Sequence, residues 1–275
     1  MIERMARIRK KYRYAVILLR ELVRTDFKLR YEGSVLGVVW SALKPLLLFS
    51  IMYVVFVHFL RFGAGIPNFA VSLLLAIVLW GFFQETTAQG MMAIVSRGGI
   101  LRKINIPKYI VVMSTSASAL INLAINLVIV VVFALINGVQ FGWMALLLIP
   151  LIIELYVFAL AVALLLSALY VKFRDLAHIW DVIMQAWYFA TPIIYPLSMI
   201  AAMSPMVAKL MMLSPMAQII QDARFVLVNQ THTETVWSTM TNPLLAMVPM
   251  VIVAVITLVS VRYFRKASRK FTELV

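Results

Sequence analysis

Long uninterrupted apolar runs constrain the fold of this chain more than any other feature of its sequence. Several of them reach or exceed the roughly 20 residues that an α-helix needs to cross the hydrocarbon core of a bilayer. Soluble domains are about half apolar and about one quarter charged, whereas this chain is 64% hydrophobic and only 13% charged. The sequence therefore predicts an all-α, polytopic membrane protein.

Six transmembrane helices are expected from the positions of the apolar runs. They cover approximately Val38–Leu60, Phe69–Met92, Ile110–Ile136, Trp143–Val171, Ile179–Ile194 and Leu244–Phe264. Of the 25 Lys and Arg residues, all but Arg61, Lys209 and Arg224 then fall on one side of the membrane. Because cytoplasmic loops collect positive charge, both termini are expected in the cytoplasm.

The net charge of +14 follows the ends of the apolar runs, so it indicates membrane topology rather than nucleic-acid binding. No cleavable signal peptide is expected, because the first long apolar run begins near Val38, after a long basic segment. The chain has no cysteine, which excludes disulfides and thiolate ligands.

The segment Tyr14–Tyr31 precedes the first apolar run and has the pattern of an amphipathic surface helix. Its apolar residues recur at three- or four-residue spacing, namely Val16, Leu19, Val23 and Phe27, with basic residues elsewhere. Such a helix suits the membrane surface, where its cations face anionic headgroups. A basic helix that is merely solvated is the alternative, and it would leave the apolar face uncovered.

The stretch QAWYFATPIIYP, Gln185–Pro196, interrupts the fifth expected span with two prolines. Each proline removes a helix hydrogen bond, and broken backbone at membrane depth is tolerated only where protein or a water-filled cavity shields it. Residues Pro192–Pro205 are therefore expected to form a re-entrant turn or a short helix on the outer side. Ser214 and Pro215 then match an N-cap followed by proline at the first helical position, which starts a further outer helix through about Val228.

Polar side chains within the expected spans indicate either interhelical contacts or a substrate path. Three ionisable residues, a kind that usually faces a bundle interior, occur there: Glu85, Glu154 and Asp181. Asp181, Gln185 and Tyr188 share one face of the fifth span. The third span carries a polar stripe at four-residue spacing, formed by Ser114, Ser118, Asn122 and Asn126. Interhelical hydrogen bonding is the preferred interpretation of that stripe, whereas the face of the fifth span fits either role.

Aromatic rings surround that face of the fifth span. Trp187, Tyr188 and Tyr195 lie deep in the span or beside the turn, and amphipathic rings of this kind suit a sugar-like surface. Core packing or an interfacial belt is the alternative for each of them. The sequence has no GxSxG nucleophile elbow, no HExxH metal helix and no GxxxxGK(S/T) phosphate loop. The chain alone is therefore expected neither to bind a metal nor to hydrolyse ATP.

Five segments occur in a recognisable order along most of the chain. They are LVRTDFKLRYEGSVLGVVWSALKPLL (Leu22–Leu47), GGILRKINIPKYI (Gly98–Ile110), LLLSALYVKFRDL (Leu164–Leu176), WYFATPIIYPLSMI (Trp187–Ile200) and LSPMAQIIQDARFVLV (Leu213–Val228). In this order they resemble the permease subunits of type-2 ABC exporters that move lipid-linked polysaccharides. The likeness is greatest to the export permeases for wall teichoic acid and for O-antigen.

The resemblance implies a homodimer of this chain joined to two copies of an ATP-binding cassette subunit, which binds the ATP and Mg²⁺. It implies an interface segment at residues 1–37, a six-span domain at 38–264 and a basic cytoplasmic tail at 265–275. Within the six-span domain, residues 91–109 would form a cytoplasmic coupling loop and residues 192–230 the outer gate helices. The residues implied to dock into the ATPase are Gly98, Gly99, Ile100, Leu101, Arg102, Lys103 and Asn105.

The resemblance also implies where the substrate passes. It implies that aromatic residues of the fifth span line a channel; together with the polar face of that span, the expected path residues are Trp187, Tyr188, Tyr195, Asp181 and Gln185. The candidates for contact with the lipid diphosphate are Arg24, Lys28, Arg30 and Lys44, because Arg and Lys pair well with phosphate. The bias of cytoplasmic loops towards positive charge explains the same cations, and that alternative stays open.

The expected cargo is wall teichoic acid linked to undecaprenyl diphosphate, moved across a bacterial cell membrane. Export of O-antigen or capsule polysaccharide is the alternative, as is a type-2 ABC exporter of a drug or small lipid. A proton-coupled secondary transporter that uses the intramembrane carboxyl groups is a more remote reading, as is a membrane enzyme acting on a polyprenyl phosphate. No inverted repeat, which many secondary transporters show, is visible in the sequence.

Overall fold

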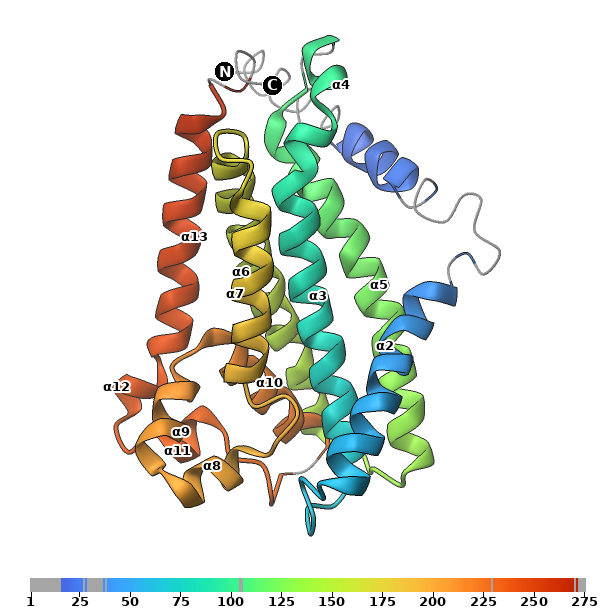
Figure 1. Ribbon diagram of the computed structural model, residues 1–275, viewed down its shortest axis with the longest axis vertical. Coiled ribbons are helices and arrows are strands. Elements are labelled where there is room, and N and C mark those ends of the chain that lie inside the picture. Colours follow the sequence, from blue (N-terminus) through green and yellow to red (C-terminus); the bar gives the residue numbers. More distant parts are fainter. Residues whose placement is uncertain are drawn as a thin grey trace.

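The computed structural model of the protein describes residues 16–26, 28, 37, 39–103, 106–228, 230–269 and 271, and over this part of the chain the fold is helical without strands. The elements are α2 (Val39–Met52), η1 (Tyr53–Phe59), α3 (Phe69–Ser96), α4 (Gly98–Lys103), α5 (Lys108–Ile136), η2 (Trp143–Leu147), α6 (Leu148–Tyr170), α7 (Leu176–Ala190), α8 (Leu197–Met203), α9 (Pro205–Met212), α10 (Pro215–Leu227), α11 (Val236–Thr239), α12 (Pro243–Ala246) and α13 (Val248–Ala267). Residues 16–26 form a further helix, called the surface helix below (Figure 1).

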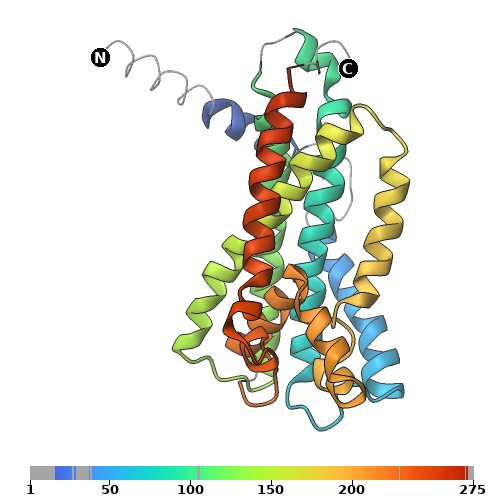
Figure 2. The ribbon, with the colours of Figure 1, turned by 90° about the vertical axis from the view of Figure 1, so that its left-hand side faces the viewer.

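Five helical segments of this described part are long and apolar enough to cross a membrane. They are Val39–Phe59, Phe69–Ser96, Lys108–Ile136, Trp143–Tyr170 and Val248–Ala267. Five of the six expected spans are therefore confirmed as candidates, and the protein is a multi-pass membrane protein. The remaining span corresponds to α7, whose 15 residues extend about 22 Å. That length is less than the roughly 30 Å hydrocarbon core, although α7 runs beside the bundle (Figure 2).

The helix α3 forms the centre of the bundle. Its apolar window is 78% buried, whereas that of the segment Val39–Phe59 is only 6% buried. α3 packs most extensively against α5 and α6, and Phe83 of α3 stacks on Phe158 of α6 with ring centroids 5.1 Å apart. Gly90 lets the two backbones approach closely, because a Cβ atom there would lie 2.6 Å from the Cβ atom of Ala163.

The expected break after the fifth apolar run is present. α7 ends with Thr191 as its C-cap residue, directly before Pro192. The chain then forms α8, an additional short helix α9 that the sequence pattern did not predict, and α10. Ser214 and Pro215 occupy the N-cap and first helical positions of α10, as expected, but the Ser214 side chain makes no capping bond. Its hydroxyl instead accepts a hydrogen bond from Trp187 Nε1 at 3.2 Å.

The two ends of the bundle differ in construction (Figure 1). The short helices α8, α9, α11 and α12 gather at one end, and α4 extends beyond α3 at the other, which is called the α4 end below. At the α4 end, Asp26 of the surface helix forms an ion pair with Arg97. Arg97 Nη1 also donates to Ser114 Oγ of α5 at 2.9 Å, and Ser114 Oγ donates to Asp26 Oδ2 at 3.3 Å. This three-residue cluster joins the surface helix, the junction of α3 with α4, and α5.

Candidate functional site

A cavity of about 750 Å³ lies between α2, α3, α5 and α7, and it is called the central cavity below. Its lining side chains come from residues 40–48 of α2, 77–89 of α3, 122–126 of α5, and Tyr188 of α7. Ligand sites in proteins have volumes of about 300–1,000 Å³ and combine apolar walls with a few placed polar groups. The central cavity has both properties.

A polar belt crosses the otherwise apolar wall that α3 and α5 form. Asn122 Nδ2 donates to Glu85 Oε1 at 2.8 Å, and Gln89 Nε2 donates to the same oxygen at 3.3 Å. In both contacts the carboxyl group accepts from an amide N–H group of a neighbouring side chain. The belt therefore presents a carboxyl group whose orientation two amide groups fix.

The contact between α2 and α5 follows from a proline inside α2. Pro45 has no N–H group, so the carbonyl of Ser41, four residues earlier, loses its usual intrahelical bond. Asn126 Nδ2 donates to this carbonyl at 3.1 Å and to the Asn122 carbonyl at 2.8 Å. The expectation that the polar stripe of the third span makes interhelical hydrogen bonds is confirmed for Ser114, Asn122 and Asn126. Ser118 instead donates within α5, to the Ser114 carbonyl at 3.0 Å.

The two neighbouring rings of α7 have different surroundings. Tyr188 lines the central cavity, with its ring edge-on to Trp80 at a centroid distance of 5.6 Å. Trp187 faces the core, where it packs edge-on against Trp80 at 5.9 Å and Phe83 at 5.4 Å. Its hydrogen bond to Ser214 holds the start of α10 against α7. Tyr188 therefore borders the central cavity, Trp187 packs in the core, and the path role of both stays a prediction.

The other expected path residues lie outside the lining of the central cavity, as far as the described residues define it. Asp181 and Gln185 are exposed on α7. The Tyr195 hydroxyl donates to the carbonyl of Phe189 at 2.7 Å and so ties the turn back onto the end of α7.

The expected phosphate-binding cations are distributed over two elements. Lys44 lines the central cavity from α2. Arg24 and Lys28 are exposed near the end of the surface helix, and Arg30 lies outside the described residues.

The expected coupling residues belong to α4 at the tip of the α4 end. Gly98 is buried, Gly99 is exposed, and Leu101 is half-buried against the apolar cluster beneath α4. The side chains of Ile100, Arg102 and Lys103, and the whole of Asn105, lie outside the described part of the chain. The docking role of this segment stays a prediction.

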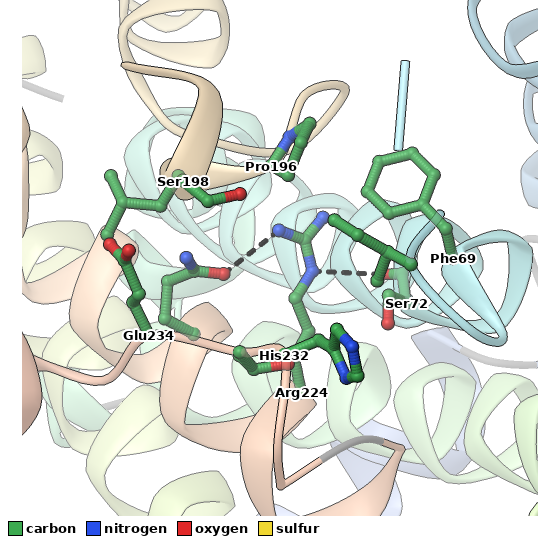
Figure 3. A pocket seen from close by; sticks show the side chains of 11 residues that line it. Phe69, Ser72, Pro196, Ser198, Arg224, His232 and Glu234 are labelled. Carbon is green, nitrogen blue, oxygen red and sulfur yellow. Dashed lines mark hydrogen bonds between the residues drawn. The ribbon is translucent and has the colours of Figure 1, made fainter. Parts of the chain in front are cut away.

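At the opposite end, Arg224 of α10 satisfies the backbone that the proline break exposes. The residue is 3% exposed, and its guanidinium donates to the carbonyls of Pro192 and Ile193, each at 2.6 Å. It also donates to the Ser72 carbonyl at 3.1 Å and to Gln221 Oε1 at 3.0 Å (Figure 3). Burial lowers the pKa of Arg224 to about 9. The adjoining pocket of about 20 Å³ holds about one water molecule, so this region is a structural junction rather than a ligand site.

Sequence reasoning did not identify the two residues that organise these regions. Arg224 was counted only as an outer-side cation, because its contact with the Pro192 carbonyl spans 32 residues of chain and no local pattern marks it. Glu85 was recognised as a costly intramembrane carboxyl group, but its partner Asn122 lies 37 residues away. Two separate polar patterns had to be paired to find that contact, and no spacing rule connects them.

The sequence is similar to a family of membrane transporters and to named members of known function. A family model described as "ABC-2 type transporter" matches residues 17–228. The chain is 32% identical over 193 residues to the O-antigen export system permease protein RfbA of Myxococcus xanthus, a match that covers 70% of this chain and 73% of that protein. It is 29% identical over 196 residues to an RfbA permease of Klebsiella pneumoniae, covering 70% of this chain and 75% of that one.

Proposed function

The chain belongs to the ABC-2 type transporter family, and from that premise we propose that it exports a lipid-linked polysaccharide of the O-antigen type. Within this family it is the non-catalytic membrane subunit, so an ATP-binding subunit must supply the energy. ATP and Mg²⁺ would be bound by that partner. The single observation that carries the proposal is the central cavity, because a transport path needs a partly polar space within the membrane-spanning bundle.

The lining of the central cavity fits a glycan better than it fits a small apolar drug. Tyr188 offers a ring edge, and Gln84, Gln89, Asn122 and Asn126 offer amide groups that can exchange hydrogen bonds with hydroxyl groups. Weak contacts of this kind allow a polymer to enter and to leave, as conduction requires.

The relatives carry O-antigen export in their names, which supports the O-antigen alternative over the wall teichoic acid that the sequence motifs favoured. Lys44, on the α2 wall of the central cavity, is the best placed of the described cations for the lipid diphosphate. Arg24 on the surface helix and Lys28 just beyond its end would contribute at the membrane surface.

The proposed assembly contains two copies of the chain and two ATPase subunits. The segment Val39–Phe59 is only 6% buried within one chain, and α7 exposes Ile179, Val182 and Phe189. A second copy against these apolar faces would close the open side of the central cavity. The α4 end would face the cytoplasm with both termini, and α4 would dock into the ATPase. α7, with the turn that follows it, would complete the sixth crossing of the membrane.

The test is co-purification of the chain with its ATPase, followed by reconstitution in lipid vesicles. ATP hydrolysis is measured with an undecaprenyl diphosphate-linked neutral oligosaccharide and with the lipid alone. Stimulation that depends on the glycan is expected. A stable complex that responds to a hydrophobic drug and to no glycan would refute the polysaccharide cargo.

A further inference from the structure

The central cavity is lined by few ionisable side chains, and they lie on different helices. Lys44 on α2 and Glu85 on α3 are the charged side chains among the described residues that line it. Asn122 and Gln89 hold the Glu85 carboxyl group in the polar belt at 2.8 and 3.3 Å. Any polymer that passes through the cavity must therefore pass the Glu85 carboxyl group, and Lys44 is the one cation among the described residues of the lining.

The length of the α3 wall determines how many repeat units of a polymer lie in the cavity at once. The lining positions of α3, residues 77–89, extend over about 18 Å of the helix. A polymer with a phosphodiester in every repeat would place phosphate groups along this length, whereas a neutral pyranose polymer would present only hydroxyl groups. One lysine cannot balance several phosphates, and a negative charge on Glu85 would repel each phosphate that passes it.

We infer that Glu85 is an ionised, specificity-determining residue, which makes the central cavity selective for neutral glycans over glycans or polyols with anionic repeat units. This inference rests on the proposed function, because it assigns the substrate class of the same cavity. Hydroxyl groups of a neutral sugar can donate to the Glu85 carboxylate, but a phosphodiester offers it no donor. If a phosphate passes about 8 Å from the Glu85 carboxylate, at an effective dielectric constant of about 20, the repulsion between these two charges weakens binding roughly 30-fold, which corresponds to about 2 kcal/mol.

The experiment uses the full complex with its ATPase in lipid vesicles and two probes on the same carrier. One probe is undecaprenyl diphosphate with a neutral N-acetylhexosamine oligosaccharide, and the other is the same lipid with an oligo(glycerol phosphate). The concentration that half-maximally stimulates ATP hydrolysis is measured for each. The wild-type complex is expected to favour the neutral probe roughly 30-fold.

The Glu85→Gln variant keeps an oxygen that accepts from Asn122 and removes the charge, so the preference for the neutral probe should disappear. The readout is the ratio of the two half-maximal concentrations in each variant, because the substitution also alters the contact of residue 85 with the neutral probe. Gln84→Glu adds a second carboxylate to the lining and should increase the preference. It serves as an independent test if Glu85→Gln does not fold. Glu154→Gln is the matched control, because Glu154 is another intramembrane glutamate but does not belong to the described lining of the cavity.

The outcomes separate this inference from the proposed function. Equal stimulation of the wild-type complex by both probes would overturn the inference and leave polysaccharide export standing. An unchanged preference in both Glu85→Gln and Gln84→Glu would do the same. A complex that neither probe stimulates would refute the proposed function, and the inference would fall with it.

Discussion

Two glycines of α3 test which face of this helix borders the central cavity and which face packs against α6. Gly81 and Gly90 are nine residues apart, which places them on opposite faces of an α-helix. Gly81 lines the cavity, and a Cβ atom there would meet nothing within 4 Å. A Cβ atom at Gly90 would lie 2.6 Å from the Cβ atom of Ala163, which is rigidly attached to the α6 backbone. The same substitution should therefore have different effects at the two positions.

The expected magnitudes follow from these distances. Alanine has a helix propensity about 0.8–1.0 kcal/mol better than glycine, and this gain is the same at both positions. At Gly90 it is offset by overpacking, which typically destabilises by about 1–3 kcal/mol because α3 and α6 must separate or distort. Gly90→Ala should then be less stable than Gly81→Ala by about 1–3 kcal/mol, or by roughly 3–10 °C in melting temperature for a chain of this size.

The assay is thermal unfolding in detergent, monitored by intrinsic tryptophan fluorescence. It compares Gly81→Ala, Gly90→Ala, Ala163→Gly and the double variant Gly90→Ala/Ala163→Gly. Removal of the Ala163 Cβ atom leaves Val112 Cγ1 at 3.5 Å and the Ala163 Cα atom at 3.6 Å as the nearest contacts, both of ordinary length. Introduced into the Ala163→Gly background, Gly90→Ala should no longer destabilise. Equal melting temperatures for Gly81→Ala and Gly90→Ala, or a clash that persists without the Ala163 side chain, would refute the assigned faces.

Three further predictions concern the ends of the bundle and the rings of α7. Reversing the charge of Asp26 or of Arg97 alone should reduce glycan-stimulated ATP hydrolysis, whereas reversing both should restore it; failure of the double reversal would mean that the ion pair carries no coupling. Arg224→Lys should lower the melting temperature, because lysine cannot reach three backbone carbonyls at once and each buried carbonyl left without a donor destabilises by about 1–3 kcal/mol; an unchanged melting temperature would contradict the junction. Trp187→Ala should reduce the yield of folded protein, while Tyr188→Ala should reduce stimulation by glycan at normal yield, and the reverse pattern would exchange their roles.

The apolar runs predicted most of the helices because hydrophobic length is a direct requirement of the bilayer. The break at Thr191 and the start of α10 at Pro215 were also predictable, since proline acts on its own backbone. The partner of the broken segment was not predictable. Arg224 reaches Pro192 across 32 residues of chain, and no local pattern encodes that distance.

The sequence did not predict which rings of α7 face the core and which face the cavity, for a different reason. A membrane helix is apolar on most of its faces, and lipid is as apolar as the protein core, so hydrophobicity does not distinguish a packed face from an open one. Trp187 and Tyr188 are adjacent, yet one packs on Phe83 and the other lines the cavity. Only the neighbouring helices decide between them.

The walls of the central cavity are held with unequal strength, and this difference indicates where the cavity can open. α3 is joined to α5 through Glu85 and Asn122 and lies close against α6 at Gly90. The α2 segment is only 6% buried, and Asn126 supplies its hydrogen bond to α5. Interhelical hydrogen bonds in membranes contribute only about 1 kcal/mol each, so the contacts within one chain hold α2 against α5 less strongly than they hold α3 against α6. An ATP-driven change needs an element with two arrangements of similar free energy. On the proposed docking of α4 into an ATPase, α2 is the candidate for that element, because the surface helix that precedes it is tied to the α4 end through Arg97.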